Sequence, residues 1–292
     1  MSFISKLRSG KFIITAEISP PKGTDTSRML RDAALLKGIA DAVNVTDNQR
    51  AVMRMSPIAA CSILQGKGFE TIMHITCRDR NRLALQSELI GASALGVRNV
   101  LVMSGDHPSK GDHEGAKPVY DLDSVQLLGM IQELNRGVDL SGNKLDGKTD
   151  FCMGAVTNTE LNEAGLIKLK KKIKIGASFL QTQAVFDVKR FSEFIEKKSE
   201  IELKQSKQIK IIAGIIPLRS ERSALFLNKV PGIRVPDDMI KQIKDAKYPE
   251  VEGMRITSDI IKELRTLCDG VHIMPVGNHE NTKKLLEMAG LI

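Results

Sequence analysis

Aromatic residues are scarce in this chain of 292 residues, which has no tryptophan and only two tyrosines. Proteins that bind single-stranded nucleic acid use aromatic side chains as stacking platforms, so this scarcity disfavours that function. The formal charge of +8 points the other way. Most lysines, however, lie in runs mixed with acidic or periodic apolar residues, as on solvated helix faces. We expect no nucleic-acid partner, and the basic surface is left for an anionic ligand or an acidic protein.

Cysteine is also sparse, and the four cysteines (Cys61, Cys77, Cys152 and Cys268) form no CxxC or Cys/His pair. Their spacing fits neither a zinc site nor a disulfide framework, so we expect no metal and reduced thiols, as in a cytoplasm. The start of the chain, MSFISKLRSGKF, lacks the apolar run of a signal peptide. The sequence has no apolar run long enough to span a membrane. These absences predict a cytoplasmic protein.

Eight segments have the apolar, β-branched character of buried strands. They are Phe12–Ser19, Ala42–Asp47, Thr71–Cys77, Asn99–Ser104, Phe151–Thr157, Phe179–Phe186, Ile209–Pro217 and Gly270–Val276. Helical patterns follow them at Thr26–Gly38, from Ser56, at Asp79–Leu95 with Asp79 as N-cap, and at Ser124–Asn135, Leu166–Ile175, Val188–Lys197, Glu221–Cys268 (broken by prolines) and Asn281–Ala289.

Strands that alternate with helices indicate βαβ units and a parallel sheet. Eight units in this length predict an α/β protein with a closed (β/α)8 TIM barrel as a single domain, residues 1–292. An open doubly wound sheet is the alternative. It is disfavoured because no GxGxxG follows any strand.

Polar residues follow the predicted strands, at the end where barrel enzymes carry their reactive groups. They are Glu17; Thr46, Asp47 and Asn48; His74, Thr76 and Arg78; Ser104 and Asp106; Thr157 and Asn158; Gln181 and Gln183; and Asn278 and His279. Individually, each has a structural alternative. Asp106 suits an Asx-turn before Pro108, His74 a hydrogen-bonded core position, and the two glutamines the ends of the ladder. Together, and without an HExxH, P-loop or GxSxG motif, they favour binding of a polar heterocycle and proton transfer.

The same segments, in this order, resemble the methylenetetrahydrofolate reductase family over nearly the whole chain. The resemblance is carried by TAEISPPKG, NVTDN, HITCRDRNR, MSGDHP, LQTQAVFD, AGIIPL and VHIMPVGNHENTKKLL. The stretch from Gly105 to Leu128 is most similar to bacterial members of one-carbon and acetyl-CoA pathways. The resemblance implies a flavin-bearing barrel that reduces 5,10-methylenetetrahydrofolate to 5-methyltetrahydrofolate.

The resemblance also implies roles for individual residues. Glu17 would be the general acid that opens the imidazolidine ring, and Asp106 would lie between pterin and flavin. Glu17, Asp106 and Gln183 would bind the folate. The flavin-contacting positions would be Thr46, Asn48, His74, Thr76, Ser104, Gly105, Asp106, Tyr120, Asp121, Asn158 and Lys172.

The sequence departs from well-known family members at several of these positions. Ser104, Gly165 and Lys168 stand where those members carry Arg, Asp and Asn, and Met274 and Asn278 replace Tyr and Arg. These departures affect the positions that contact the adenine and pyrophosphate of FAD, so FMN is an alternative to FAD, which stays the first expectation from the resemblance. The resemblance implies NAD(P)H or an iron–sulfur partner protein as the electron donor. The unclustered cysteines of this chain cannot hold an iron–sulfur cluster themselves. We expect a homo- or hetero-oligomer.

Two other functions stay open at this point. One is a lyase or isomerase on an anionic substrate, with Lys172 and Arg78 as anion holders. The other is a non-catalytic folate- or flavin-binding subunit of a larger redox complex.

Overall fold

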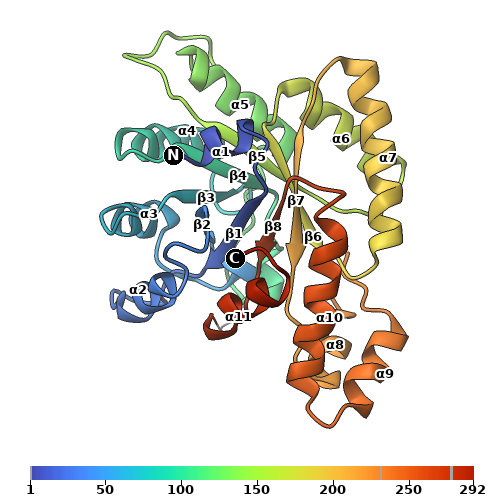
Figure 1. Ribbon diagram of the computed structural model, residues 1–292. Coiled ribbons are helices and arrows are strands. Elements are labelled where there is room, and N and C mark those ends of the chain that lie inside the picture. The colour runs from blue at the N-terminus through green and yellow to red at the C-terminus, as the bar shows by residue number, and fades with distance from the viewer. Residues whose placement is uncertain (1, 231, 277–278) are drawn as a thin grey trace.

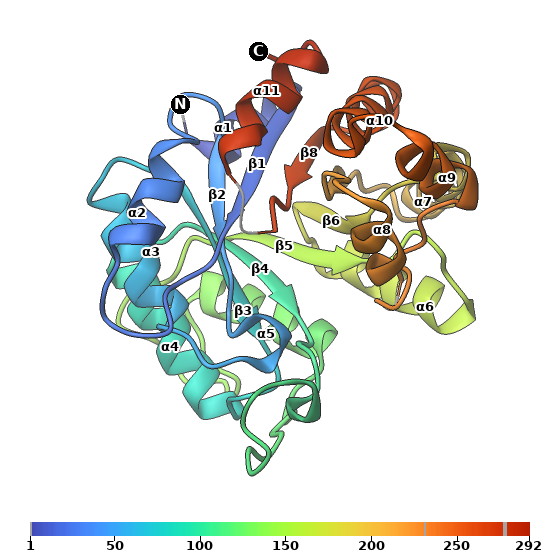
Figure 2. The same ribbon diagram turned by 90° about the horizontal axis from the view of Figure 1, so that it is seen from below.

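Eight parallel strands close into a barrel in the computed structural model, which describes residues 2–230, 232–276 and 279–292. Each strand pairs with the next, and β8 returns to β1 with Ile13 opposite Gly270 (Figures 1 and 2). The strands are β1 (Ile13–Ile18), β2 (Ala42–Val45), β3 (Thr71–Thr76), β4 (Asn99–Met103), β5 (Cys152–Thr157), β6 (Phe179–Ala184), β7 (Lys210–Ile215) and β8 (Gly270–Ile273). Each falls inside its predicted segment, and the predicted (β/α)8 barrel is confirmed.

Helices surround the barrel (Figure 2). They are α2 (Ser27–Ala34), α3 (Pro57–Gln65), α4 (Arg82–Ala94), α5 (Ser124–Arg136), α6 (Glu163–Ile175), α7 (Val188–Gln205), α10 (Pro249–Leu264) and α11 (Glu280–Met288). After β7 the chain adds α8 (Glu221–Leu227) and α9 (Asp237–Asp245), which lie with α10 on one side of the molecule (Figure 1). Within the described residues, no helix combines the length and apolar character needed to cross a membrane.

One cap prediction is wrong. The N-cap of α4 is Asn81, whose side chain accepts a hydrogen bond from the Ala84 N–H, and not Asp79. Asp79 is engaged instead by the guanidinium of Arg78, at 2.7 Å.

The first helix, α1 (Phe3–Arg8), was not predicted. It closes the end of the barrel opposite α8 and α9 (Figure 1). Phe3 and Leu7 form one apolar cluster with a residue from each of seven strands, namely Ile13, Ala42, Ile72, Leu101, Cys152, Phe179 and Ile212. The rings of Phe3 and Phe179 meet edge to face with centroids 5.3 Å apart. The N-terminal end of the barrel is therefore closed by apolar side chains.

The next inward-facing layer is polar. Thr15 Oγ1 lies 2.9 Å from His272 Nδ1, and Asn44 Nδ2 lies 3.0 Å from His74 Nε2 and 2.8 Å from Gln181 Oε1. Burial lowers the pKa of His74 to about 4 and that of His272 to about 3, so both rings are neutral at pH 7.

Strand alternation brings a third layer to the C-terminal mouth. Side chains two residues further along a strand leave the same face. Glu17 therefore follows Thr15, Thr46 follows Asn44 and Thr76 follows His74. The candidate site includes this third layer, which lies above the polar side chains of the lumen.

Candidate active site

Glu17 lies near the end of β1, just before Pro20 and Pro21 end the strand. Its side chain is half-buried and accepts a hydrogen bond from Gln49 Nε2 at 2.9 Å. Burial raises the pKa of Glu17 to about 7, although the Gln49 bond and the charge of Arg54 act in the opposite direction. A carboxyl group with this pKa is protonated in about half of the molecules at neutral pH, which suits a general acid.

The loop after β2 reaches Glu17 through a strained turn. Asn48, Arg50 and Ala51 have φ values of 44°, 59° and 57°. Such left-handed conformations are uncommon outside glycine and cost about 1 kcal/mol or more each. The turn is held by Arg54, whose N–H donates to Asn48 Oδ1 at 2.9 Å and whose guanidinium donates to the Pro20 carbonyl at 3.0 Å.

The loops after β1, β2 and β4 are joined to one another at the mouth. Lys22 Nζ lies 2.6 Å from the carboxylate of Asp112, which also accepts from the Met53 N–H at 3.4 Å. Gly111 has no side chain to keep the loops apart, and a Cβ there would lie 1.9 Å from the Ala51 carbonyl oxygen. The strained turn is thus packed on both sides.

The side chain of Arg78 is bound within the protein and is not free to hold an anion. The prediction that Arg78 holds an anionic substrate is therefore wrong. Its side chain is 2% exposed and bound to the Asp79 carboxylate. It also donates to the carbonyls of Asn48 and Asp106, both at 3.2 Å. With these acceptors in place, its guanidinium ties the ends of β2, β3 and β4 together and is not available to a substrate.

Gly105 and Asp106 form the turn after β4. Gly105 has φ +82°, and a Cβ there would lie 3.0 Å from Thr76 Cβ, so only glycine fits without strain. Tyr120, with φ 41°, donates its hydroxyl to the Gly105 carbonyl at 3.2 Å. Asp106 is exposed and lies 3.8 Å from Lys110 Nζ. The turn at Pro108 is capped by His107 Nδ1, which accepts from the Ser109 N–H, so the Asx-turn role is filled by the histidine.

The remaining mouth residues differ in what they bind. Thr46 Oγ1 is buried without a hydrogen-bond partner among the described residues, which leaves it free for a ligand. The Thr76 hydroxyl and N–H both donate to the buried Asp47 carboxylate at 2.9 Å. Gln183 lies at a register shift between β6 and β7, where Gly214 allows the Thr182 carbonyl close approach. Irregular pairing of this kind re-aims side chains beside active sites.

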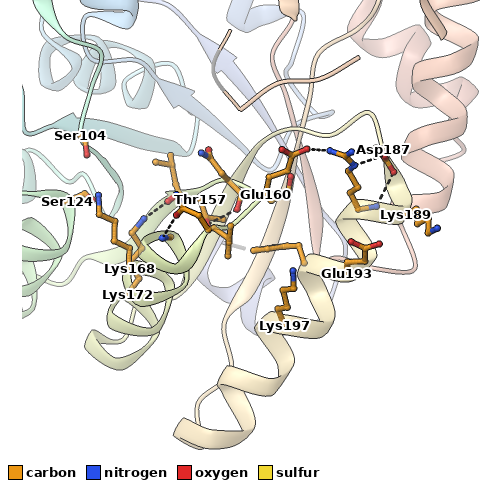
Figure 3. A pocket seen from close by; sticks show the side chains of 18 residues that line it. Ser104, Ser124, Thr157, Glu160, Lys168, Lys172, Asp187, Lys189, Glu193 and Lys197 are labelled. Carbon is orange, nitrogen blue, oxygen red and sulfur yellow. Dashed lines mark hydrogen bonds and ion pairs between the residues drawn. The ribbon is translucent and has the colours of Figure 1, made fainter. Parts of the chain in front are cut away.

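A cavity of about 1050 Å³ opens from the ends of β4 and β5 between α6 and α7 (Figure 3). Among its lining residues are Ser104, Asn158, Lys168, Lys172, Lys189 and Lys197. Lys172 is buried and donates to the Val156 carbonyl at 2.7 Å. Burial, followed by the nearby charge of Lys168, lowers the pKa of Lys172 to about 8. No ion pair joins Lys168 or Lys172 to a carboxylate in the described part of the chain, although the charge of Asp123 acts on Lys172, and Glu160, Asp187 and Glu193 also line the cavity. The two neighbouring lysines favour an anionic ligand.

The predicted site residues thus fall into separate groups. Ser104, Thr157, Asn158 and Lys172 line the cavity, whereas Glu17 and Thr46 lie at the barrel mouth and Gln183 lies at the register shift between β6 and β7. Several other predicted residues are engaged by the protein itself. His74 is held by Asn44 in the lumen, and Asp121 accepts three hydrogen bonds from Arg82, so that its pKa falls to about 2.

Asn278 lies outside the described residues. His279 is buried before α11. Across the residues with described coordinates, no cluster of three or more His, Cys, Asp or Glu side chains is arranged to hold a metal ion.

Gln49 and Arg54, which surround Glu17, were missed by sequence reasoning. They lie in a loop, and their approach to Glu17 depends on positive φ values at non-glycine residues. Asn48 is the one residue of this turn whose type favours such a conformation, so the sequence carried little signal.

Comparison with known proteins agrees with the resemblance. The family model Methylenetetrahydrofolate reductase matches residues 3–290. The probable methylenetetrahydrofolate reductase (NADPH) of Caenorhabditis elegans is 26% identical over 84% of this chain, and the chain spans only 36% of that protein. The 5,10-methylenetetrahydrofolate reductase of Pectobacterium carotovorum is 24% identical over 87% of this chain and 82% of its own.

Among solved structures, an uncharacterized protein from Clostridium thermocellum that binds two copies of 5-methyl-5,6,7,8-tetrahydrofolic acid has the same fold. The TM-score is 0.71 at 16% identity, covering 98% of this chain and 96% of the other. The match over almost every residue decides the family: the chain belongs to the methylenetetrahydrofolate reductase family.

Proposed function

We propose that this protein reduces 5,10-methylenetetrahydrofolate to 5-methyltetrahydrofolate with a bound flavin. The observation that carries the proposal is the environment of Glu17, at the mouth of a barrel of this family, where burial raises the pKa of its carboxyl group to about 7. That an uncharacterized protein of the same fold binds 5-methyltetrahydrofolic acid supports a folate as the ligand.

Glu17 would supply the proton that the reaction needs. The nitrogen that leaves the methylene carbon is weakly basic, so the ring opens readily only if an acid protonates it. A carboxyl group retains its proton near pH 7 only when burial disfavours its charged form, as it does at Glu17. Gln183 would hydrogen-bond the pterin, and Asp106, on the turn after β4, would hold it against the cofactor.

The residues present fit a flavin. Thr46 offers a buried, unpartnered hydroxyl at the mouth. Lys168 and Lys172 would hold the phosphate of the cofactor in the cavity beside α6 (Figure 3). Its volume of about 1050 Å³ is at the upper end of the range for cofactor sites. Bound flavin supplies the hydride.

The identity of the flavin and of the electron donor extends this proposal. We favour FAD because the cavity continues to Lys197 on α7, beyond the two lysines of α6. The donor would be NAD(P)H or an iron–sulfur partner protein in a homo- or hetero-oligomer. A formal charge of +8 would attract an acidic partner electrostatically.

Replacing the acid tests the proposal directly. Flavin-loaded protein is reduced anaerobically with dithionite and then mixed with 5,10-methylenetetrahydrofolate while flavin absorbance is followed. We expect Glu17→Gln to reduce freely but to reoxidise with folate about 100-fold or more slowly, because a general acid contributes about 10²–10⁴ in rate.

Glu133→Gln makes the same chemical change on α5, where Glu133 pairs with Arg136, and should leave reoxidation unchanged. Equal reoxidation rates in Glu17→Gln and the unmodified protein would show that the acid is another group. A protein that takes up neither FAD nor FMN would refute the reductase proposal as a whole.

A further inference from the structure

We infer that Gln49 is a positioning residue for Glu17: it holds the carboxyl group toward the folate and accommodates both of its protonation states. This inference rests on the proposed function. Its basis is the bond from Gln49 Nε2 to Glu17 Oε1 at 2.9 Å, made by a side chain from a different strand's loop.

Ser19 is the second hydrogen-bond partner of the Gln49 amide. Its hydroxyl donates to Gln49 Oε1 at 3.4 Å, while the NH₂ group donates to Glu17. Glu17 lies near the end of β1, and Ser19 follows directly after Ile18, the last residue of the strand. Gln49 therefore bridges the end of β1 and the residue that follows it, and its bond restrains the Glu17 carboxyl group.

The backbone around Gln49 is held in a strained conformation beside the acid. Positive φ values at Asn48, Arg50 and Ala51 surround it. The turn persists because Arg78 and Arg54 bind Asn48, at its carbonyl and its side chain, and because Gly111 packs on Ala51. Strain maintained by several independent contacts is typical of functional sites. A surface loop without a function would not be expected to retain it.

The chemistry of an amide suits a group that gains and loses a proton in every turnover. An amide carries both a donor and an acceptor, so it can donate to the carboxylate and, after rotating by 180°, accept from the carboxylic acid. The Ser19 hydroxyl can follow, since it too both donates and accepts. A lysine or arginine at this position would stabilise only the ionised form of Glu17 and so weaken the acid role.

The test measures the pH dependence of folate-driven reoxidation in pre-reduced, flavin-loaded protein. The unmodified protein should lose rate as pH rises through the pKa of Glu17. Gln49→Met keeps the length of the side chain but removes the hydrogen bond that stabilises the carboxylate, so this limb should move up by about 0.5–1 pH unit. Gln49→Lys adds a nearby positive charge and should move it down by about one unit or more.

Gln65→Lys is the matched control, since Gln65 ends α3 and bonds the Gly96 carbonyl far from the mouth. Its limb should stay in place. Opposite shifts in the two Gln49 variants support the inference, whereas an unmoved limb in both, even with a uniformly lower rate, overturns it while leaving the reductase proposal intact. If the unmodified protein shows no folate-driven reoxidation at any pH, the proposed function fails, and this inference fails with it.

Discussion

His272 is an ionisable residue in the centre of the barrel that the fold keeps uncharged. It is fully buried, and its ring contacts Thr15 Oγ1 through Nδ1, while Nε2 has no partner among the described residues. Burial, followed by the proximity of His74, holds its pKa at about 3. A neutral imidazole can both donate and accept a hydrogen bond, so the lumen tolerates it without a counter-charge.

Protonation of His272 should therefore destabilise the folded protein as the pH falls. Its unfolded pKa is near 6.5 and its folded pKa near 3, so the unfolded chain binds more protons between these values. The contribution of His272 to stability is therefore present above pH 6.5 and is lost as the pH falls below that value. Between pH 7 and 5 this histidine should account for about 2 kcal/mol of lost unfolding free energy.

Urea unfolding of the unmodified protein and of His272→Asn at both pH values measures this loss. The variant should lose about 2 kcal/mol less than the parent between pH 7 and 5. Glu17 works in the opposite direction in this range, because its pKa is raised, but it contributes equally to both proteins. Parallel losses in the two proteins would mean that His272 is already protonated when folded.

Residue types and strand positions were enough to place part of the candidate site. Glu17 could be placed at the mouth because period-two alternation follows from strand geometry alone, whereas the register shift at Gln183 could not be predicted. The lumen pairings of Asn44 with His74 and Gln181 could not, because they depend on which strands face each other across the closed ring. Gln49 also escaped prediction, since its approach to Glu17 is set by backbone angles that the residue types do not specify.

At the scale of elements, α1 shows how a short helix can matter beyond its length. Its six residues are too few to form a stable helix alone, and its stability must come from packing. Phe3 is fully buried against the apolar end of the lumen, and its N–H donates to Glu70 Oε1 at 3.2 Å. The helix is therefore part of the barrel core.

Removing the anchor of α1 should destabilise the whole protein. Phe3→Ala leaves a cavity next to Phe179, and truncations of this kind cost about 3–5 kcal/mol. Arg8→Ala on the exposed side of the same helix should change unfolding free energy by less than about 0.5 kcal/mol. Denaturant unfolding compares the two, and a loss below about 1 kcal/mol for Phe3→Ala would indicate that α1 is detached in solution.

Long periodic elements were predictable, and short or irregular ones were not. Each strand lies within its predicted segment because a buried parallel strand reads as a continuous apolar run. The α1 helix lacks enough residues for a periodic signal, and the N-cap of α4 was misassigned because Arg78 competes for Asp79. The prolines at 236 and 249 did indicate where α9 and α10 begin.

For the whole molecule, closure of the barrel links the two ends of the sequence. Residues of β1 pair with β2 on one side and with β8 on the other, so residues 13–18 and 270–273 share one ladder. No strand can leave the ring without exposing two rows of backbone hydrogen-bonding groups. We therefore predict that residues 1–292 unfold as a single cooperative unit.

The absence of tryptophan makes this prediction easy to test, because one introduced tryptophan reports on its own surroundings without background. Phe226→Trp places the probe in α8, in the C-terminal part of the chain, and Phe69→Trp places it before β3, in the N-terminal part. Both positions are at least partly exposed. If the molecule is one domain, fluorescence of either variant and far-ultraviolet circular dichroism should give coincident urea midpoints. An earlier midpoint for the α8 probe alone would mean that α8 and α9 unfold separately from the barrel. That result would contradict unfolding as a single unit, because a single unit gives the same midpoint at every probe.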